Sequence, residues 1–198
     1  MQDSSDDALS ELVRKAKSGN LQAFRGLYDL YSKRVLNFAF KMLNNREEAE
    51  DVTQEAFTSV FKKLQSLQDD SRFEAWLFRI TRNFVYQRYR QRTGEHVSLE
   101  SDNELKQEIS SLRAPVKSPE EAILANELRD VVERLIAELP EQFRAVFVLS
   151  ALQGFSYQAI SEIVGKSVPA VKTDIHRARL EVRQKIKQFL GTLLENEL

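Results

Sequence analysis

The clearest chemistry in the sequence lies toward the C-terminal end, where side chains that bind bases and phosphates share one side of a predicted helix. These six residues are Lys172, Thr173, His176, Arg177, Arg179 and Arg183. Lysine and arginine donate to guanine edges, and threonine contacts base edges or phosphate. At 100° per residue the first four face outward near the helix N-terminus, and the last two flank them. The pattern predicts a duplex-DNA surface, with Arg179 and Arg183 placed at phosphates.

The elements around these residues are typical of a helix-turn-helix. Ser156 is expected to cap a short helix that Gly165 ends, and Ser167 begins a longer one. The longer helix has an apolar stripe for packing, formed by Val171, Ile175, Ala178, Val182 and Ile186. In this motif the N-terminal end of the second helix enters the major groove. The alternative is an amphipathic helix with a solvated basic face. A metal role for His176 lacks partners, because the chain has one other His and no Cys.

A second set of candidate binding residues lies within residues 72–92, RFEAWLFRITRNFVYQRYRQR. Helical spacing predicts an apolar stripe of Phe73, Trp76, Leu77, Ile80 and Phe84. The remaining face carries cations, amides and a tyrosine, namely Arg79, Arg82, Asn83, Tyr86 and Gln87. Cations follow a phosphate backbone while aromatics and amides contact unpaired bases, so this face suits single-stranded DNA. The alternative is a core helix with ordinary surface arginines.

The charge distribution supports both surfaces although the net charge is only −1. Residues 72–92 hold six Arg against one acid, and residues 166–187 hold seven Lys or Arg against two acids. Between them, residues 93–127 hold three bases against eight acids. Because local potential attracts phosphate, the two basic segments remain candidates for DNA binding despite the neutral whole.

Apolar spacing is helical throughout and the chain has only six Gly and four Pro, so we predict an all-α fold of two small domains. Residues 1–92 form a four-helix domain. Residues 93–117 are acidic and lose the periodicity, as in a flexible linker. Ser118-Pro119-Glu120-Glu121 then carries a helix-start signature, so residues 118–198 form the second domain. Within that domain we expect a helix that opens at Pro140 and runs through Leu152.

Several classes of protein do not fit the sequence. Zero Cys excludes disulfides and thiolate metal sites, and no apolar run is long enough for a membrane span. The acidic N-terminus is unlike a signal peptide, which predicts a cytoplasmic protein. The carboxylates Glu47, Glu48, Glu50 and Asp51 lack a His partner or a metal-binding loop. No phosphate loop or nucleophile elbow is present, so we predict no enzyme activity and no cofactor.

Three segments together resemble a known family. AEDVTQEAF (49–57) resembles its polymerase-binding helix, FEAWLFRITRN (73–83) its promoter-melting helix, and residues 139–179 its second-domain signature. The family is the sigma-70 family of bacterial RNA polymerase sigma factors, and the group is the small, two-domain extracytoplasmic-function (ECF) factors. The fold that the resemblance implies is a sigma-2-like four-helix domain and a sigma-4-like helix-turn-helix domain, joined by the linker.

The resemblance implies a factor that binds core RNA polymerase and directs promoter-specific initiation. The first domain would bind the clamp helices of the largest subunit through Asp51, Gln54, Glu55, Phe57 and Phe61. It would melt the −10 element, with a flipped base captured by the loop 68–72, through Asp70, Ser71 and Arg72 together with the polar face of residues 79–87. The second domain would read the −35 element through the six residues named first. The acidic linker would thread the RNA channel of the polymerase.

The sequence departs from the family pattern at three places. The loop usually reads Arg-Gly-Asp-Ser and here reads Gln68-Asp69-Asp70-Ser71, Gln158-Ala159 replaces a usual pair of Glu, and Asp174 replaces a usual Arg that would contact phosphate. The resemblance also implies a separate anti-sigma partner and a role in a stress or envelope response. The alternative is a free-standing helix-turn-helix regulator that does not depend on polymerase.

Overall fold

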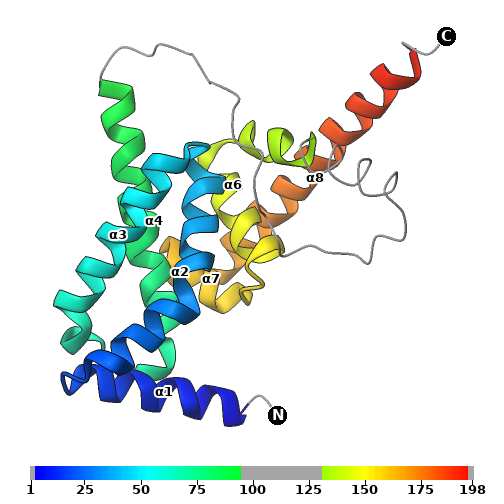
Figure 1. The fold of residues 1–198 in the computed structure, drawn as a ribbon. Helices are drawn as coiled ribbons and strands as arrows, with labels where there is room; N and C mark the ends of the chain where they lie inside the picture. The colour runs from blue at the N-terminus through cyan, green and yellow to red at the C-terminus, as the bar shows by residue number, and fades with distance from the viewer. Residues whose placement is uncertain (1–2, 95–130, 196–198) are drawn as a thin grey trace, which may run out of the picture.

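The computed structural model describes residues 3–94 and 131–195, and these are helical without strands. The first domain contains α1 (Asp3–Lys17), α2 (Leu21–Leu43), α3 (Arg46–Lys63) and α4 (Phe73–Gly94), with short 3-10 turns between α3 and α4. Figure 1 shows α2, α3 and α4 packed beside one another, with α1 crossing their end. The predicted linker falls almost wholly outside the described residues, as does the helix start at Ser118.

Local sequence signals set the helix boundaries of the first domain. The Asn20 side chain accepts a hydrogen bond from the Ala23 amide at 3.0 Å, which caps α2. At the other end Asn44 adopts the left-handed conformation, φ 51°, which ends the helix. Asn45 then caps α3 by accepting from the Glu48 amide at 3.0 Å. The adjacent asparagines thus end one helix and start the next, so that α2 and α3 form a tight antiparallel pair.

The second domain begins in the described residues with a helical segment at 131–137. It continues with α6 (Glu141–Phe147), η3 (Val148–Leu152), α7 (Tyr157–Val164) and α8 (Val168–Glu195). The helix expected from Pro140 to Leu152 is present, but its last five residues widen into a π-helix. The Gln153 amide donates to the Val148 carbonyl, five residues back, at 3.0 Å.

The expected apolar stripe of α4 is partly wrong. Phe73 and Leu77 are fully buried, but Trp76, Ile80 and Phe84 are only half-buried. The other completely buried positions of this helix are Phe78, Thr81 and Val85. The physical reason is that α4 is covered on more than one side, by α2 and α3 of its own domain and by α7 of the second. A helix buried on two sides has no single stripe at 3.6-residue spacing.

The two domains pack directly against each other, so their buried residues form one continuous core. The Phe78 ring of α4 meets the Phe155 ring, which precedes α7, edge-to-face with 4.8 Å between centroids. Helix α2 also contacts α6 and η3. Helix α7 packs on α4, as can be followed in Figure 1. The segments that the sequence analysis marks as DNA-binding therefore belong to one packed body.

Candidate nucleic-acid interface

The helix-turn-helix has the caps and the turn that the sequence predicts. The Ser156 hydroxyl accepts from the Ala159 amide at 3.2 Å, which caps α7. Gly165 ends α7 in the left-handed conformation, φ 70°, and a Cβ there would touch nothing within 4 Å. The Ser167 hydroxyl then accepts from the Ala170 amide at 3.4 Å where α8 begins. The turn therefore needs glycine for its backbone conformation rather than for space.

The outer face of α8 presents the side chains predicted to read duplex DNA. Val171, Ile175, Ala178 and Val182 are buried and α8 packs on α6 and α7, which confirms the apolar stripe at these four positions, whereas Ile186 is half-buried. On the opposite side all six candidates are exposed, namely Lys172, Thr173, His176, Arg177, Arg179 and Arg183. Burial of the stripe fixes the rotation of α8, so these six residues point outward together.

Asp174 has a structural role that the sequence did not reveal. Its residue is 9% exposed, and its carboxylate accepts from the Lys166 ammonium at 2.6 Å. Lys166 belongs to the turn between α7 and α8. The ion pair therefore joins the turn to the second turn of α8, and it holds Lys166 away from the outer face. The acid at position 174 pairs with a cation of its own domain at the place where the family pattern has a phosphate contact.

The polar face of α4 is present but unevenly exposed. Arg79, Asn83 and Gln87 are exposed, whereas Arg82 and Tyr86 are half-buried. The Arg82 guanidinium carbon lies 4.4 Å from the centre of the Tyr86 ring, a cation–π contact. Exposed residues 79, 83 and 87 follow one another at a spacing of four residues, so an arginine and two amides form a row along the helix.

A pocket of about 460 Å³ lies at the N-terminal end of α4, where a base could enter. Its lining combines the loop, α4 and one residue of α7, and consists of Ser66, Leu67, Gln68, Asp69, Arg72, Ala75, Trp76, Arg79 and Glu162. Trp76 and Leu67 supply apolar surface, and Arg72 and Arg79 supply positive charge. An aromatic side chain beside cations is the combination that holds an unstacked base and its phosphate.

The loop residues differ in how available they are. Asp70 is engaged by α1, because the Lys17 ammonium donates to its carboxylate at 2.6 Å and to the Leu67 carbonyl at 2.5 Å. The amide and hydroxyl of Ser71 donate to Asp69, at 3.0 and 2.6 Å, and lower the pKa of that carboxyl. Arg72 is exposed and forms an ion pair with Glu162 of the second domain at 3.0 Å. Asp70 and Ser71 thus shape the loop, and Arg72 reaches the pocket.

The predicted polymerase-binding residues on α3 separate into two kinds. Asp51 and Gln54 are exposed, and Phe61 is 55% exposed. Glu55 is half-buried and accepts from Arg88 of α4 at 2.8 Å. Phe57 is only 4% exposed, which corrects its expected place on the binding surface.

Phe57 instead supports an aromatic surface formed with α2. The Tyr28 ring lies 4.7 Å from the Phe57 ring, and the Phe24 ring lies 5.0 Å from the Phe61 ring. The Tyr28 side chain is 42% exposed. An exposed apolar patch beside the polar Asp51 and Gln54 is typical of a protein-binding surface.

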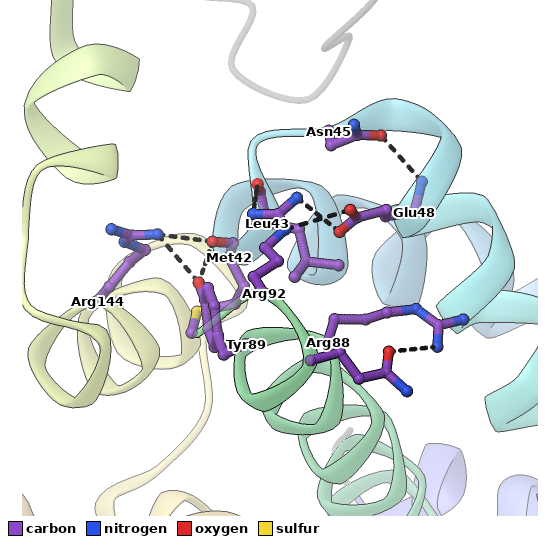
Figure 2. Close-up of polar contacts among 9 residues, drawn as sticks. Met42, Leu43, Asn45, Glu48, Arg88, Tyr89, Arg92 and Arg144 are labelled. Atoms are coloured by element: carbon purple, nitrogen blue, oxygen red, sulfur yellow. Dashed lines mark hydrogen bonds and ion pairs between the residues drawn. The ribbon is translucent and has the colours of Figure 1, made fainter. Parts of the chain in front are cut away.

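Arg144 of α6 joins the two domains at the C-terminal end of α2. It donates to the Met42 carbonyl at 2.6 Å and contacts the Tyr89 hydroxyl at 3.0 Å. Tyr89 itself donates to the same Met42 carbonyl, and Arg144 also bonds the Ala137 and Leu139 carbonyls of its own domain. Figure 2 shows Arg144 and Tyr89 converging on Met42. The guanidinium therefore lies at the negative ends of two helices at once.

Arg92 and Glu48 make further polar contacts at the C-terminal end of α2. Arg92 donates to the Leu43 carbonyl at 3.2 Å and pairs with Glu48 of α3 at 2.6 Å, as seen in Figure 2. Burial raises the pKa of Tyr89 to about 12, so its phenol is neutral at physiological pH. Sequence reasoning missed this cluster, because its members come from five separate segments of the chain and no spacing relates them.

No helix in the described part of the chain is long and apolar enough to cross a membrane.

Comparison with known proteins matches both domains. The family model described as Sigma-70 region 2 matches residues 27–95, and the one described as Sigma-70, region 4 matches residues 129–182. The ECF RNA polymerase sigma factor SigW of Bacillus subtilis (strain 168) is 30% identical over 184 residues, covering 91% of this chain and 98% of that protein. The ECF RNA polymerase sigma-E factor of Escherichia coli (strain K12) is 31% identical over 184 residues, covering 90% and 94%.

Solved structures have the same fold. CnrH, in complex with the cytosolic domain of CnrY, superposes with a TM-score of 0.69 at 26% identity, covering 92% of this chain and 99% of that one. The sigma factor RpoE of Bartonella quintana, in complex with the anti-sigma factor NepR, superposes with a TM-score of 0.65 at 24% identity, covering 83% and 96%. The chain therefore belongs to the sigma-70 family, in its ECF group of RNA polymerase sigma factors.

Proposed function

We propose that the three surfaces of this sigma factor divide the work of promoter-specific initiation. The aromatic and polar surface of α2 and α3 binds the clamp helices of the largest subunit of core RNA polymerase. The polar face and pocket of α4 capture the melted −10 strand, and the outer face of α8 reads the −35 duplex. The exposed face of α8 carries the proposal, because six side chains suited to bases and phosphates point outward from one rigid helix.

The −35 element is read by the first turns of α8. Lys172, Thr173, His176 and Arg177 lie at the end that enters the major groove in a helix-turn-helix, and Arg179 and Arg183 reach phosphates. Asp174 keeps Lys166 in the turn through its ion pair, so the turn contributes less positive charge than its sequence suggests. Specificity at −35 then rests on the outward side chains of residues 172–177.

The −10 strand is held by α4 and the loop before it. Arg72 and Arg79 attract phosphate at the pocket, and Trp76 provides a stacking surface for a flipped base. Beyond the pocket, Asn83, Tyr86 and Gln87 contact the following bases, and Arg82 supports Tyr86 through its cation–π contact. Asp70 and Ser71 keep the loop in shape through Lys17 and Asp69, respectively.

Polymerase binding uses the exposed members of the predicted set. Asp51 and Gln54 supply polar contacts, and Phe61 and Tyr28 supply apolar area. The buried Phe57 ring packs against the Tyr28 ring and positions it. Both structural neighbours were solved as complexes with another protein. We extend this to a separate anti-sigma protein that holds the present factor in the cytoplasm until a stress or envelope signal releases it.

The test is run-off transcription with core polymerase and a pooled promoter library, with and without this protein. We expect discrete new start sites that share an upstream and a downstream element. Asp51→Asn and Gln54→Ala should weaken polymerase binding, whereas Glu11→Gln removes the charge of an exposed residue on α1 and should leave it unchanged. Absence of new starts, with duplex binding intact, would instead indicate a regulator that works without polymerase.

A further inference from the structure

Helix α7 covers part of the surface that is proposed to hold single-stranded DNA. Glu162 of α7 lines the pocket beside Arg72, and its carboxylate accepts from the Arg72 guanidinium at 3.0 Å. On its own helix, Gln158 donates to the same carboxylate oxygen at 3.2 Å. Two carboxylates thus line the pocket and pair with Arg72. Asp69 of the loop lies 3.2 Å from the Arg72 Nε atom, and Glu162 is supplied by the other domain.

The contact between α7 and α4 belongs to a larger docked interface. Next to the Phe78–Phe155 ring pair, the Arg34 guanidinium carbon of α2 lies 5.5 Å from the centre of the Phe155 ring. Arg34 donates to the Gln153 carbonyl at 2.9 Å and to its side-chain oxygen at 3.3 Å, and it pairs with Glu74 of α4. Lys41 of α2 pairs with Glu133 of the second domain at 2.7 Å. An aromatic ring pair, a cation–π contact, hydrogen bonds and an ion pair therefore hold the domains together.

This docked arrangement cannot bind both promoter elements at once. The −10 and −35 elements are centred about 25 base pairs apart, which is about 85 Å of duplex. Helix α7 has eight residues, a length of about 12 Å, and three residues separate it from α8. Because α7 lies directly on α4, the reading end of α8 is held far too close to α4. The interface must open before the factor spans a promoter.

We propose that α7 is an intramolecular competitor of the −10 strand, with the Glu162 carboxylate occupying the place of a DNA phosphate at Arg72. This inference rests on the proposed role of α4 in holding that strand. A carboxylate and a phosphate both accept hydrogen bonds from a guanidinium, so the two ligands exclude each other at this arginine. Arg72 is itself 60% exposed at its side chain. An exposed ion pair contributes little, so the strand is able to displace Glu162.

The first experiment measures binding of a fluorescein-labelled, 12-nucleotide single strand of randomised sequence to the full chain by anisotropy. We expect Glu162→Gln to bind about two to five times more tightly than the natural chain. Glu138→Gln is the matched control, because Glu138 pairs with Lys185 inside the second domain and loses the same charge. Equal affinities for Glu162→Gln and Glu138→Gln would overturn the competition, since any gain would then be a general charge effect.

The second experiment measures docking itself. The chain has no Cys, so Thr58→Cys on α3 and Gln184→Cys on α8, both exposed, accept a donor and an acceptor dye specifically. We expect high energy transfer in the free chain and a decrease when the single strand is added. Phe155→Ala should lower transfer in the free chain and tighten strand binding at least fivefold, with duplex binding unchanged as a check of folding.

The outcomes separate this inference from the function on which it rests. If no variant binds the single strand, the assignment of α4 fails and the competition fails with it. If every variant binds equally well and energy transfer does not respond to the strand, α4 keeps its role and only the competition is wrong. Tighter binding together with lower transfer supports both.

Discussion

The two helices proposed to bind DNA differ in how exposed their candidate residues are. The outer face of α8 is exposed at all six predicted positions, whereas α4 is covered by α7 at one end and bordered by Arg144 at the other. The surface proposed to read duplex DNA is complete within its own domain. The surface proposed to bind the single strand shares its pocket with a residue of the second domain. One surface is therefore fully exposed, whereas the other is partly covered by the second domain.

The difference follows from how each helix is buried. Helix α8 has one apolar stripe, so its opposite face is left to solvent. Helix α4 has buried residues on several sides, including Phe78, which faces Phe155 of the second domain. A helix that is buried on more than one side has less surface left for exposed polar side chains. Each prediction below tests one side of this contrast.

The largest effect on stability is expected from Arg144→Gln, which removes the hydrogen bonds of this guanidinium at the C-terminal end of α2. Glutamine removes the positive charge at two helix C-termini and leaves the Met42, Ala137 and Leu139 carbonyls short of donors. We expect the free energy of unfolding to fall by about 2–3 kcal/mol, measured by urea denaturation. The exposed Arg134→Gln in the preceding helical segment is the control and should cost less than 0.5 kcal/mol. Equal losses in the free energy of unfolding for the two variants would show that Arg144 does not stabilise the interface between the domains.

Tyr89 gives the same contact a pH dependence. Its pKa is about 12 in the folded chain and about 10 when unfolded, so the folded state holds the phenol proton more tightly. The resulting stability is complete below pH 10 and is lost as the pH rises from 10 to 12, by up to about 3 kcal/mol. Urea titrations across this range should show a steeper decline for the natural chain than for Tyr89→Phe. Parallel declines would show that the phenol is not buried as described.

The exposed outer face of α8 is tested by Arg177→Ala. Arg177 lies at the reading end of α8, and its loss should weaken binding to a −35 duplex about tenfold, or about 1.4 kcal/mol. Gln184→Ala lies on the same side about two turns farther along and should have little effect. Competition anisotropy with the promoter found by transcription provides the measurement. A larger loss for Gln184→Ala would mean that the helix enters the groove differently.

The smallest effect on DNA binding is expected from Asp174→Asn, which tests how Lys166 contributes beside the outer face of α8. Without its carboxylate partner at 2.6 Å, Lys166 becomes available to phosphate. Binding to duplex should tighten a few-fold, and the slope of log K against log salt should become steeper by about one. Glu181→Gln on α8 removes the same charge and serves as the control. An unchanged slope would show that Lys166 does not reach the backbone.

The helix-turn-helix was predictable in detail because its signals are local. Ser156, Gly165 and the stripe at Val171 and Ile175 each act within a few residues of their own position, and all take the predicted roles. The all-α fold and the family followed from motifs in the same way. Where neighbours in sequence determine structure, spacing and cap chemistry are sufficient.

The misses involve partners that are distant in sequence. Phe57 was expected on the binding surface but is buried, because α2 packs over it and places the Tyr28 ring 4.7 Å from its own ring. Asp70 pairs with Lys17, 53 residues away, and Arg72 with Glu162, 90 residues away. The stripe predicted for α4 was only partly right because the second domain covers another side of this helix, at Phe78. These contacts depend on how helices and domains dock, which a single sequence does not encode in its spacing.

The position of Arg144 has a consequence for how such a protein evolves. One guanidinium completes the fold of its own domain, at Leu139, and also holds the first domain, at Met42. Selection on the strength of docking therefore cannot act on Arg144 without also damaging the domain that carries it. Within its own domain Glu162 accepts from the exposed Gln158 side chain and not from a helix end. Under the proposed competition, a change at Glu162 would therefore alter the readiness of the factor while leaving its architecture intact.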